Sequence, residues 1–557
     1  MSNKKKRPWW KKSLTMLLII AALLVLIYHG IRLWVIIPDP EISDISAVEK
    51  EITSYQNFTG FEKNRLRRSE SGLWEMYLEG QAFERGVAAG KMTKELLNYQ
   101  EDAFVEQIRN IIPSDFYLRF LRTFIGIFNR NLPKYIPEEY QHEIYGIALS
   151  CNRTYDFIGT PYERQLNYHS AHDLGHTMQD YMLVGCTSFA VWDSFTEDSS
   201  LLIGRNFDFY VGDKFAENKI IAFYNPDRGY KFATVTWAGM TGVLSGMNEK
   251  GLTVTINAAK STIPSSSAMP ISILCREILQ YASTIDEAYA IAQNRKTFVS
   301  ESILIGSGIE NRAVIFEKSP DNIAIYQTST GELICANHYQ SETFLHDIRN
   351  IQNIANSDSP YRQKRTEELI ETHTPLNPHK AALILRNRFG LADRDIGMGN
   401  EKAVNQLICH HSVIFAPKQK IMWVSTSPWQ IGEYVAYDLN TVFSYPDFSN
   451  ELKTDSLTIE ADLFLNSADY INFIQYKEKT SNIKQTINNK SDLTEEWIQQ
   501  YIATNPELYY VYNLIGDYYI SRKKTDKAIS YWELALEKEI PKREEQEKIQ
   551  RKINKAK

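Results

Sequence analysis

The chain has 557 residues, of which 43% are hydrophobic and 23% charged, and its formal net charge is −6 at pH 7. A chain of this length is expected to fold into about two to four structural units. Its composition is that of a globular protein that can bury a large core. The negative net charge supplies no basic field, which argues against a nucleic acid as partner.

The N-terminus combines a basic flank with a long apolar stretch. Residues 1–13 are rich in lysine and arginine, and residues 14–37 are predominantly apolar. A helix needs about 20 apolar residues to cross a bilayer, and a basic flank favours the cytoplasmic side. The alternative, a cleaved signal peptide, has a shorter apolar core and an A-x-A-like exit, neither of which is present. We therefore expect a single-pass anchor in a bacterial inner membrane, with the chain after Pro40 facing the periplasm or the cell exterior.

Two regions with different residue patterns follow the anchor. Residues 50–185 are expected to form a helical N-terminal segment, because apolar and charged residues recur at helical spacing in 84–99 and 102–112. From residue 186, short runs of β-forming residues separated by turn signals predict a meander of antiparallel strands, with blocks of helices between later strands. Such blocks predict an α+β domain of packed sheets with helical layers outside, over 186–465. The expected strands are 187–192, 201–209, 220–224, 231–237, 252–256, 302–306, 313–318, 323–327, 333–336, 412–415 and 421–425, and the expected helices are 271–281, 285–292, 361–371 and 380–388.

The C-terminal part is expected to be a polar linker, 466–492, and a helical tail, 490–557. Six residues of the tail have the types and spacing of a tetratricopeptide unit: Tyr512, Gly516, Tyr519, Ala528, Trp532 and Ala535. A single unit does not bury its faces, since about three repeats are normally needed for stability. The tail would therefore pack on the main domain, cap further repeats, or bind a protein partner. An ordinary helical hairpin is the alternative.

The five cysteines include one candidate nucleophile. They are scattered, without CxxC spacing, so neither a zinc site nor a redox dithiol is expected from them. Cys186 follows Gly185 and opens the first expected strand. The other four we expect to be structural: Cys151, Cys275, Cys335 and Cys409.

The next expected strand carries charges that suit a nucleophilic thiol. Arg205 and Asp208 follow one hairpin turn after Cys186. A neighbouring cation lowers a thiol pKa from about 8.5. If Cys186 became a new N-terminus, its α-amine, with a pKa of about 7.7–8.0, would be a suitable base that Asp208 could orient. The alternatives are a buried small hydrophobic cysteine and a plain cross-strand ion pair.

Four sequence blocks resemble one protein family. They are Gly185-Cys186-Thr187-Ser188-Phe189, Gly204-Arg205-Asn206-Phe207-Asp208, Gly246-Met247-Asn248-Glu249-Lys250-Gly251-Leu252 and Cys335-Ala336-Asn337-His338-Tyr339. In this order they resemble the group that joins the choloylglycine hydrolases to the acyl-coenzyme A:isopenicillin N acyltransferases, within the N-terminal-nucleophile hydrolases. The segment 80–86, with Gly90, resembles the acyltransferase side. The likeness spans roughly residues 70–430.

The resemblance implies a four-layer αββα sandwich and autocatalytic cleavage between Gly185 and Cys186. It implies that Cys186 is the nucleophile, that its freed amine is the base, and that Arg205 and Asp208 support it. Asn257 and Asn337 match positions that line the oxyanion hole, although both could also be turn residues at strand ends. The family has a further downstream arginine, for which three residues compete: Arg386, Arg388 and Arg394.

The expected activity is that of an amidohydrolase or acyltransferase acting on small N-acyl compounds, without a cofactor. Hydrolysis is favoured over transfer, because acyl-coenzyme A is a cytoplasmic donor. A rival is a zinc-dependent hydrolase, since His169, His172 and His176 have the i, i+3, i+7 spacing of ligands on one helix face. Another is a non-catalytic membrane-anchored adaptor that binds a partner through its tetratricopeptide-like tail.

Overall fold

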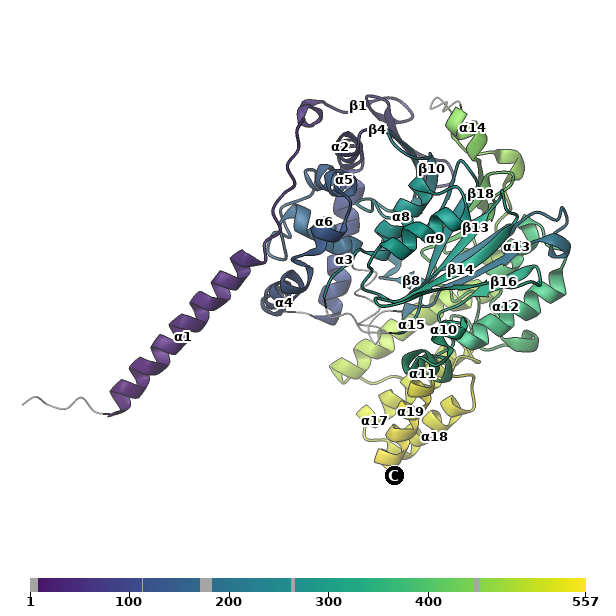
Figure 1. Cartoon of the computed structure of the whole chain (residues 1–557). Helices are drawn as coiled ribbons and strands as arrows, with labels where there is room; N and C mark the ends of the chain where they lie inside the picture. The colour runs from purple at the N-terminus through teal and green to yellow at the C-terminus, as the bar shows by residue number, and fades with distance from the viewer. Residues whose placement is uncertain (1–8, 113, 171–182, 262–265, 445–449) are drawn as a thin grey trace, which may run out of the picture.

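The computed structural model describes residues 9–112, 114–170, 183–261, 266–444 and 450–557. Figure 1 shows two sheets with helices on both outer sides, from which one long helix projects. The C-terminal helices, coloured yellow, lie below the sheets in the same view.

The core is built on two sheets. An eleven-stranded sheet has the order β1-β2-β3-β4-β9-β10-β11-β12-β13-β14-β15, and a six-stranded sheet has the order β16-β6-β7-β17-β18-β19. Within the large sheet β4 is parallel to β9, whereas its other pairings are antiparallel. The strands of the large sheet are β1 Thr53–Ser54, β2 Thr59–Phe61, β3 Asn64–Arg68, β4 Trp74–Gly80, β9 Ile220–Pro226, β10 Phe232–Thr236, β11 Ser245–Asn248, β12 Leu252–Ala258, β13 Glu301–Ser307, β14 Arg312–Lys318 and β15 Ile323–Tyr326. Those of the small sheet are β16 Glu332–Cys335, β6 Thr187–Val191, β7 Leu202–Phe207, β17 His411–Ala416, β18 Ile421–Ser425 and β19 Tyr434–Asp438.

The two sheets pack face to face between helical layers. On β13, Leu304 points into the core between the sheets, whereas Ile303 and Ile305 point into the core beneath the helices, as the period of two in a strand requires. The helices α8 (Ile271–Tyr281) and α9 (Ile285–Asn294) cover the large sheet. The helices α12 (Ser359–His373) and α13 (Pro378–Leu385) cover the small sheet. This helix–sheet–sheet–helix order confirms the predicted αββα sandwich.

The strands predicted between residues 187 and 425 are all present, but they do not form one meander. β6 and β7 form a hairpin in the small sheet, and the chain then crosses to the large sheet for β9–β12. Local turn signals show where a strand ends but not which sheet the next strand joins, which is why the prediction was wrong. Strands β11 and β19 were not predicted.

The segment 50–185 is not only helical. It begins with β1–β4, which extend the large sheet. In β3 only the central Leu66 and the first residue are buried, and arginines occupy the other positions, so the strand has little apolar signal. The helices of this segment are α2 Ala82–Met92, α3 Lys94–Ile111, α4 Asp115–Asn129, α5 Glu138–Ala148 and α6 Pro161–His169. A break at Thr93 divides the helix expected over 84–99 into α2 and α3.

The expected polar linker is largely a helix, α15 (Ala468–Asn489), because its apolar residues Phe473 and Ile483 are buried. The tail contains the expected helical hairpin, α17 (Tyr509–Ser521) and α18 (Thr525–Leu536). A Cβ at Gly516 would lie 2.4 Å from the Trp532 ring, so this glycine permits close helix packing. The helices α16 (Glu495–Thr504) and α19 (Arg543–Ala556) flank the hairpin. Its assignment as a tetratricopeptide unit stays a prediction.

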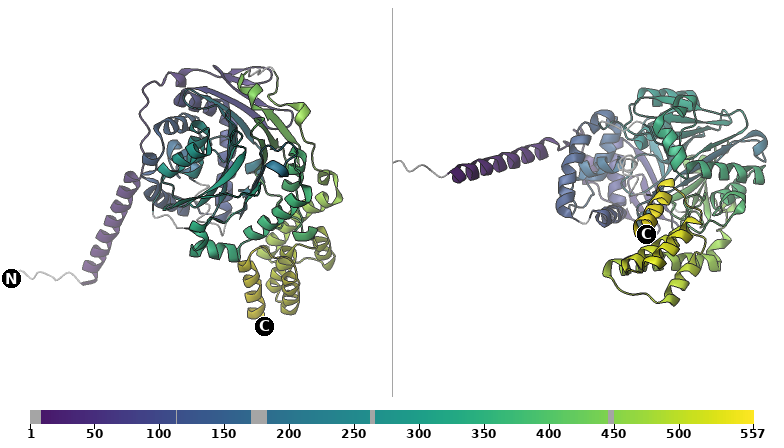
Figure 2. Two further views of the ribbon diagram at one scale, coloured as in Figure 1. Left: turned by 45° about the vertical axis from the view of Figure 1, so that its right-hand side comes forward. Right: turned by 90° about the horizontal axis from the view of Figure 1, so that it is seen from below.

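The N-terminal helix α1 (Trp9–Trp34) stands away from the body in all views (Figures 1 and 2). Its segment Ser13–Trp34 has a mean hydropathy of 2.5 and is long enough to cross a membrane. Directly after it, Val35 and Ile37 are buried in the body, so the end of α1 is attached to the folded domain.

The segment before Cys186 is tied to the rest of the domain by a buried ionic group. Glu143 on α5 accepts from Arg85 Nη2 on α2 at 2.8 Å and from Arg276 Nη2 on α8 at 3.3 Å. All three side chains are inaccessible to solvent or nearly so. This ionic group and the seven residue pairs between β4 and β9 join the chain before residue 186 to the chain after it.

Glu143→Ala should lower the free energy of unfolding by about 3 to 5 kcal/mol, because it leaves two buried guanidinium groups without their carboxylate. Urea unfolding followed by tryptophan fluorescence measures the change. Glu138→Ala is the matched control, since that side chain lies on the same helix and is 83% exposed. A loss below about 1 kcal/mol for Glu143→Ala, as expected for an exposed pair, would contradict the role of this group.

Candidate active site

The β6–β7 hairpin brings Arg205 to Cys186. Ser188 pairs with Arg205 in the antiparallel register, so the arginine lies beside the start of β6. Its Nη2 is 3.8 Å from Cys186 Sγ, and both side chains are fully buried. The predicted proximity of the cation and the thiol is therefore present in the structure.

Arg205 is held by neutral acceptors rather than by a carboxylate. Its guanidinium donates to Ser245 Oγ and to the carbonyl of Ile256, and it packs 4.4 Å from the centroid of the Phe207 ring. His411 Nε2 lies 3.4 Å from Arg205 Nη1 and 2.8 Å from Ser245 Oγ. The sequence did not indicate His411, because this residue begins strand β17 and belongs to no recognisable motif.

The thiol of Cys186 is protonated in this arrangement. Burial raises its pKa to about 11, and the nearby Arg205 opposes this rise. A thiol with this pKa is almost entirely uncharged at neutral pH, so it needs a base before it becomes a nucleophile.

Asp208 follows β7, and its carboxylate is fully buried. Neither of its side-chain oxygens has a hydrogen-bond partner of standard geometry in the described part of the chain. Burial raises its pKa to about 7, whereas Arg362 and Arg205 act to lower it. Its backbone carbonyl accepts from the Gly185 amide at 3.0 Å, so the carboxylate belongs to the surroundings of the Gly185–Cys186 peptide.

The Gly185–Cys186 peptide is fixed from two sides. Gln406 Nε2 donates to the Gly185 carbonyl oxygen at 3.1 Å, and Arg362 Nη1 donates to the Cys186 carbonyl oxygen at 2.6 Å. A Cβ at position 185 would lie 2.6 Å from Gln406 Nε2, so a larger residue here would displace the Gln406 amide. The preceding β5 (Leu183–Val184) pairs with β8 (Phe209–Tyr210) and holds the chain in this position.

Both predicted asparagines lie in this network. Asn257 accepts from Ser188 Oγ at 2.8 Å and donates to the Cys335 carbonyl at 2.7 Å. Asn337 donates to the Ala258 carbonyl at 3.0 Å and accepts from Arg362 Nη2 at 2.7 Å. The structure thus brings both asparagines to the strands around Cys186, and their oxyanion-hole role stays a prediction.

The downstream arginine at this site is Arg362, which is none of the three predicted candidates. Besides the Cys186 carbonyl, it donates to Thr187 Oγ1 at 2.8 Å, and Asp358 accepts from its Nε at 2.8 Å. The three predicted arginines lie elsewhere: Arg386 donates to the carbonyls of Gln430, Gly432 and Glu460, Arg388 pairs with Asp462, and Arg394 pairs with Glu539. Arg362 was missed because a single arginine on a charged helix has the pattern of a solvated side chain.

The histidine hypothesis is contradicted for His169. The Thr241 amide donates to its Nε2 at 2.8 Å, and its Nδ1 donates to the Gln165 carbonyl at 2.7 Å, so both ring nitrogens are occupied. Burial lowers the pKa of His169 to about 4. His172 and His176 lie outside the described residues. Among the residues that the structure describes, no group of three potential ligands is placed to hold a metal ion.

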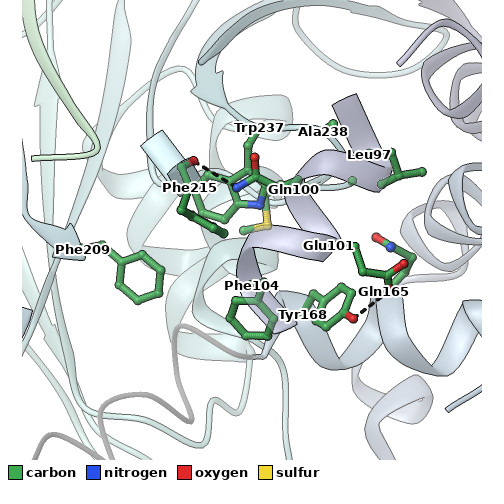
Figure 3. A pocket seen from close by; sticks show the side chains of 12 residues that line it. Leu97, Gln100, Glu101, Phe104, Gln165, Tyr168, Phe209, Phe215, Trp237 and Ala238 are labelled. Carbon is green, nitrogen blue, oxygen red and sulfur yellow. Dashed lines mark hydrogen bonds between the residues drawn. The ribbon is translucent and has the colours of Figure 1, made fainter. Parts of the chain in front are cut away.

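An apolar pocket lies beside β8. It holds about 40 Å³ of space that a water-sized molecule can occupy, and it is partly open to solvent. Figure 3 shows its aromatic lining and the side chains of Gln100 and Glu101. The lining residues are Leu97, Gln100, Glu101, Phe104, Gln165, Tyr168, Phe209, Phe215, Trp237, Ala238, Gly239 and Met240. Phe209 stacks on Phe207, which packs under Arg205, so aromatic contacts connect the pocket with the buried thiol.

Comparison with known proteins decides which family this site resembles. Residues 195–427 match the family model of acyl-coenzyme A:6-aminopenicillanic acid acyl-transferase. The predicted resemblance is confirmed. The match includes the blocks at 204–208, 246–252 and 335–339 and begins after Cys186.

Curated relatives cover the same central part of the chain. An uncharacterised protein of Archaeoglobus fulgidus is 27% identical over 273 residues, which are 46% of this chain and 45% of the relative. Protein dcd1B of Dictyostelium discoideum is 24% identical over 274 residues, which are 46% of this chain and 52% of the relative. The chain thus spans about half the length of these relatives.

Among solved structures, a Caenorhabditis elegans N-acylethanolamine-hydrolyzing acid amidase ortholog is 16% identical, with a TM-score of 0.32 over 42% of this chain and 93% of that chain. A TM-score of this size carries no weight for function. The fold assignment stands on the layers described above.

Asp208→Asn should change how stability depends on pH. The folded-state pKa of about 7 lies above the unfolded value of about 3.9, so the folded protein holds this proton more tightly. The stability that Asp208 contributes is complete below pH ~4 and is lost as the pH rises through ~7. In the uncleaved Cys186→Ala chain, Asp208→Asn should therefore gain relative stability between pH ~4 and ~8, by at most about 4 kcal/mol. Urea unfolding across this range measures it, and parallel pH profiles would contradict the raised pKa.

Proposed function

We propose that the chain is a membrane-anchored cysteine amidohydrolase or acyltransferase of the N-terminal-nucleophile type, activated by cleavage between Gly185 and Cys186. Its substrates are small N-acyl amides, and its catalytic domain faces away from the cytoplasm. The family match supports the amide chemistry. The observation that carries the proposal is the set of fixed contacts around one buried peptide bond.

Those contacts supply what the cleavage needs. The thiol of Cys186 lies next to its own preceding carbonyl, as in any Gly–Cys dipeptide, and Gly185 has no side chain to block the approach. Gln406 donates to the oxygen on which negative charge develops. Arg205, 3.8 Å from the sulfur, favours the thiolate form. A donor at a developing oxyanion is usually worth about 100- to 1,000-fold in rate.

The cleavage proceeds in two steps, formation of a thioester and its hydrolysis. The sulfur of Cys186 attacks the Gly185 carbonyl carbon, the C–N bond breaks, and the thiol proton passes to the departing amine, which leaves a thioester. Water then hydrolyses the thioester, releasing the Gly185 carboxylic acid and restoring the thiol. The product has a free α-amine at Cys186, which did not exist in the intact chain.

Asp208 is a suitable partner for the new amine. Its carboxylate is fully buried and has no hydrogen bond of standard geometry among the described residues, and its backbone carbonyl accepts from the Gly185 amide. An ammonium group beside it would compensate a buried carboxylate that is otherwise costly. The same amine, in its neutral form, would take the proton of Cys186 during attack on an amide substrate.

We infer that the acyl part of the substrate lies against the apolar pocket, because its aromatic walls favour an apolar group. β8, which pairs with β5 just before Gly185, contributes Phe209 to this pocket, so the pocket adjoins the proposed cleavage site.

Wild-type protein should consist of two chains, one of which begins with Cys186, and Cys186→Ala should remain one chain without activity. N-terminal sequencing and intact mass measurement test this directly. The two pieces should copurify without denaturant, because β1–β4 remain in the large sheet after cleavage. An active wild-type protein that stays in one piece would refute the free-amine mechanism.

Gln406→Leu should slow the cleavage by about 100- to 1,000-fold, because the substitution removes the donor to the Gly185 carbonyl at similar volume. The rate is measured as the appearance of the fragment that begins at Cys186. Gln430→Leu is the matched control, since Gln430 is also buried and its amide donates to the Leu385 carbonyl instead. Equal cleavage rates in the two folded variants would remove Gln406 from the mechanism.

A further inference from the structure

The helix α4 exposes an unusually large apolar face. Phe116 is 81% exposed, Phe124 54% and Phe120 42%. Ile127 continues this face, which repeats every three or four residues along α4, while Leu118 and Asn129 on the other side are buried. A soluble protein normally covers a continuous aromatic face of this kind, and an uncovered one marks a contact surface.

The position of α4 indicates what covers this face. A Cβ at Gly126 would lie 2.8 Å from Val35 Cγ2, so the α4 backbone packs tightly against the residue that follows α1. Arg130 donates to the Trp34 carbonyl at 3.0 Å and lies 3.6 Å from the centroid of the Trp34 ring. In Figure 1 the label of α4 lies next to the upper end of α1. The exposed aromatic face is therefore held at the level at which α1 ends.

The length of α1 places that level at a membrane surface. The 22 residues of its apolar segment span about 33 Å as a helix, close to the thickness of ~30 Å of a bilayer core. The end of α1 at Trp34 then lies at the interface, where tryptophan is enriched. A helix packed against this end lies in the same layer.

The charges of α4 suit the same surroundings. Arg119 and Arg130 are exposed on the helix and just after it, and Arg122 pairs with Glu163. The one acidic residue of α4, Asp115, pairs with Arg109 at 3.1 Å. Exposed arginines beside an aromatic face are typical of a helix that lies in a membrane interface and contacts phosphate groups.

We propose that α4 lies flat in the outer headgroup layer of the bilayer that α1 crosses, with Phe116, Phe120 and Phe124 inserted among the acyl chains. The partner is a lipid surface. This inference rests on the proposed anchoring by α1, but it concerns a separate surface of the folded domain and has a separate readout.

The test uses the full chain, reconstituted into vesicles of equal parts phosphatidylethanolamine and phosphatidylglycerol. An environment-sensitive fluorophore is attached at Phe124→Cys or, as the matched control, at Ile309→Cys, an apolar residue that is 65% exposed in the turn between β13 and β14. The unsubstituted chain, labelled in parallel, corrects for the partly buried native thiol of Cys151.

At position 124 the fluorescence should shift to the blue, lose most of its intensity to nitroxide-labelled lipids and resist aqueous iodide. At position 309 the iodide should quench and the lipid nitroxide should not. Quenching at 124 by iodide alone would overturn the proposal, and so would shielding from both quenchers, which would show that protein covers α4.

Alkaline extraction of the same vesicles distinguishes a failure of the α1 anchor from a failure of the proposed position of α4. Release of the chain at alkaline pH refutes the anchor formed by α1 and, with it, the interfacial position of α4. Resistance to extraction together with an iodide-quenched label at 124 refutes only the position of α4.

Discussion

The peptide group between Gly185 and Cys186 is buried, and much of the surrounding structure supplies hydrogen bonds to this dipeptide. Polar groups removed from water need hydrogen-bond partners inside the protein, and buried charges need still more compensation. Both carbonyl oxygens of this dipeptide receive a side-chain donor, one from Gln406 and one from Arg362. By contrast, neither carboxylate oxygen of Asp208 has a hydrogen bond of standard geometry in the described part of the chain. A buried carboxylate beside Gly185 and Cys186 thus lacks the compensation that the carbonyl oxygens of the dipeptide have.

The sheet order explains how distant segments reach this peptide. β6 has β16 on one side and β7 on the other, and β17 lies next to β7. Residues that follow β16 therefore meet the start of β6, as Asn337 does, and residues that precede β17 approach from the other side, as Gln406 does. α12, which covers the small sheet, adds Arg362 between them. Four separate parts of the chain thus meet at one dipeptide.

The segment before Cys186 is part of the folded core. Its strand β4 lies inside the large sheet, parallel to β9, and its helix α5 carries the carboxylate that compensates two buried arginines. Removing it would expose a sheet edge and leave Arg276 without the Glu143 carboxylate, both of which are unfavourable. The same segment begins directly after α1 and carries α4, so it joins both helices to the sandwich.

The sequence was most informative where the signal is local. Alternating apolar runs predicted the strands from 187 to 425, and the block around Gly185-Cys186 together with Arg205 and Asp208 predicted the nucleophile and its charged neighbours. The adjacency of Cys186 and Arg205 could be predicted because one hairpin turn separates them, so the antiparallel register brings them together. The strands β1–β4 were not predicted in this way: β1 and β2 have only two and three residues, and arginines occupy three of the five positions of β3.

The sequence alone determined most strands of the central sandwich and the apolar N-terminal helix, and it identified Cys186 as the candidate nucleophile. The tertiary structure alone decided which sheet each strand joins, that Arg362 rather than Arg386, Arg388 or Arg394 contacts the site, and that Gln406 holds the Gly185 carbonyl. The reason is physical. Periodicity and turn residues act over a few positions, whereas the partners of a buried polar group are chosen by packing between segments more than 170 residues apart, as the separations of 176 and 221 residues show for Arg362 and Gln406.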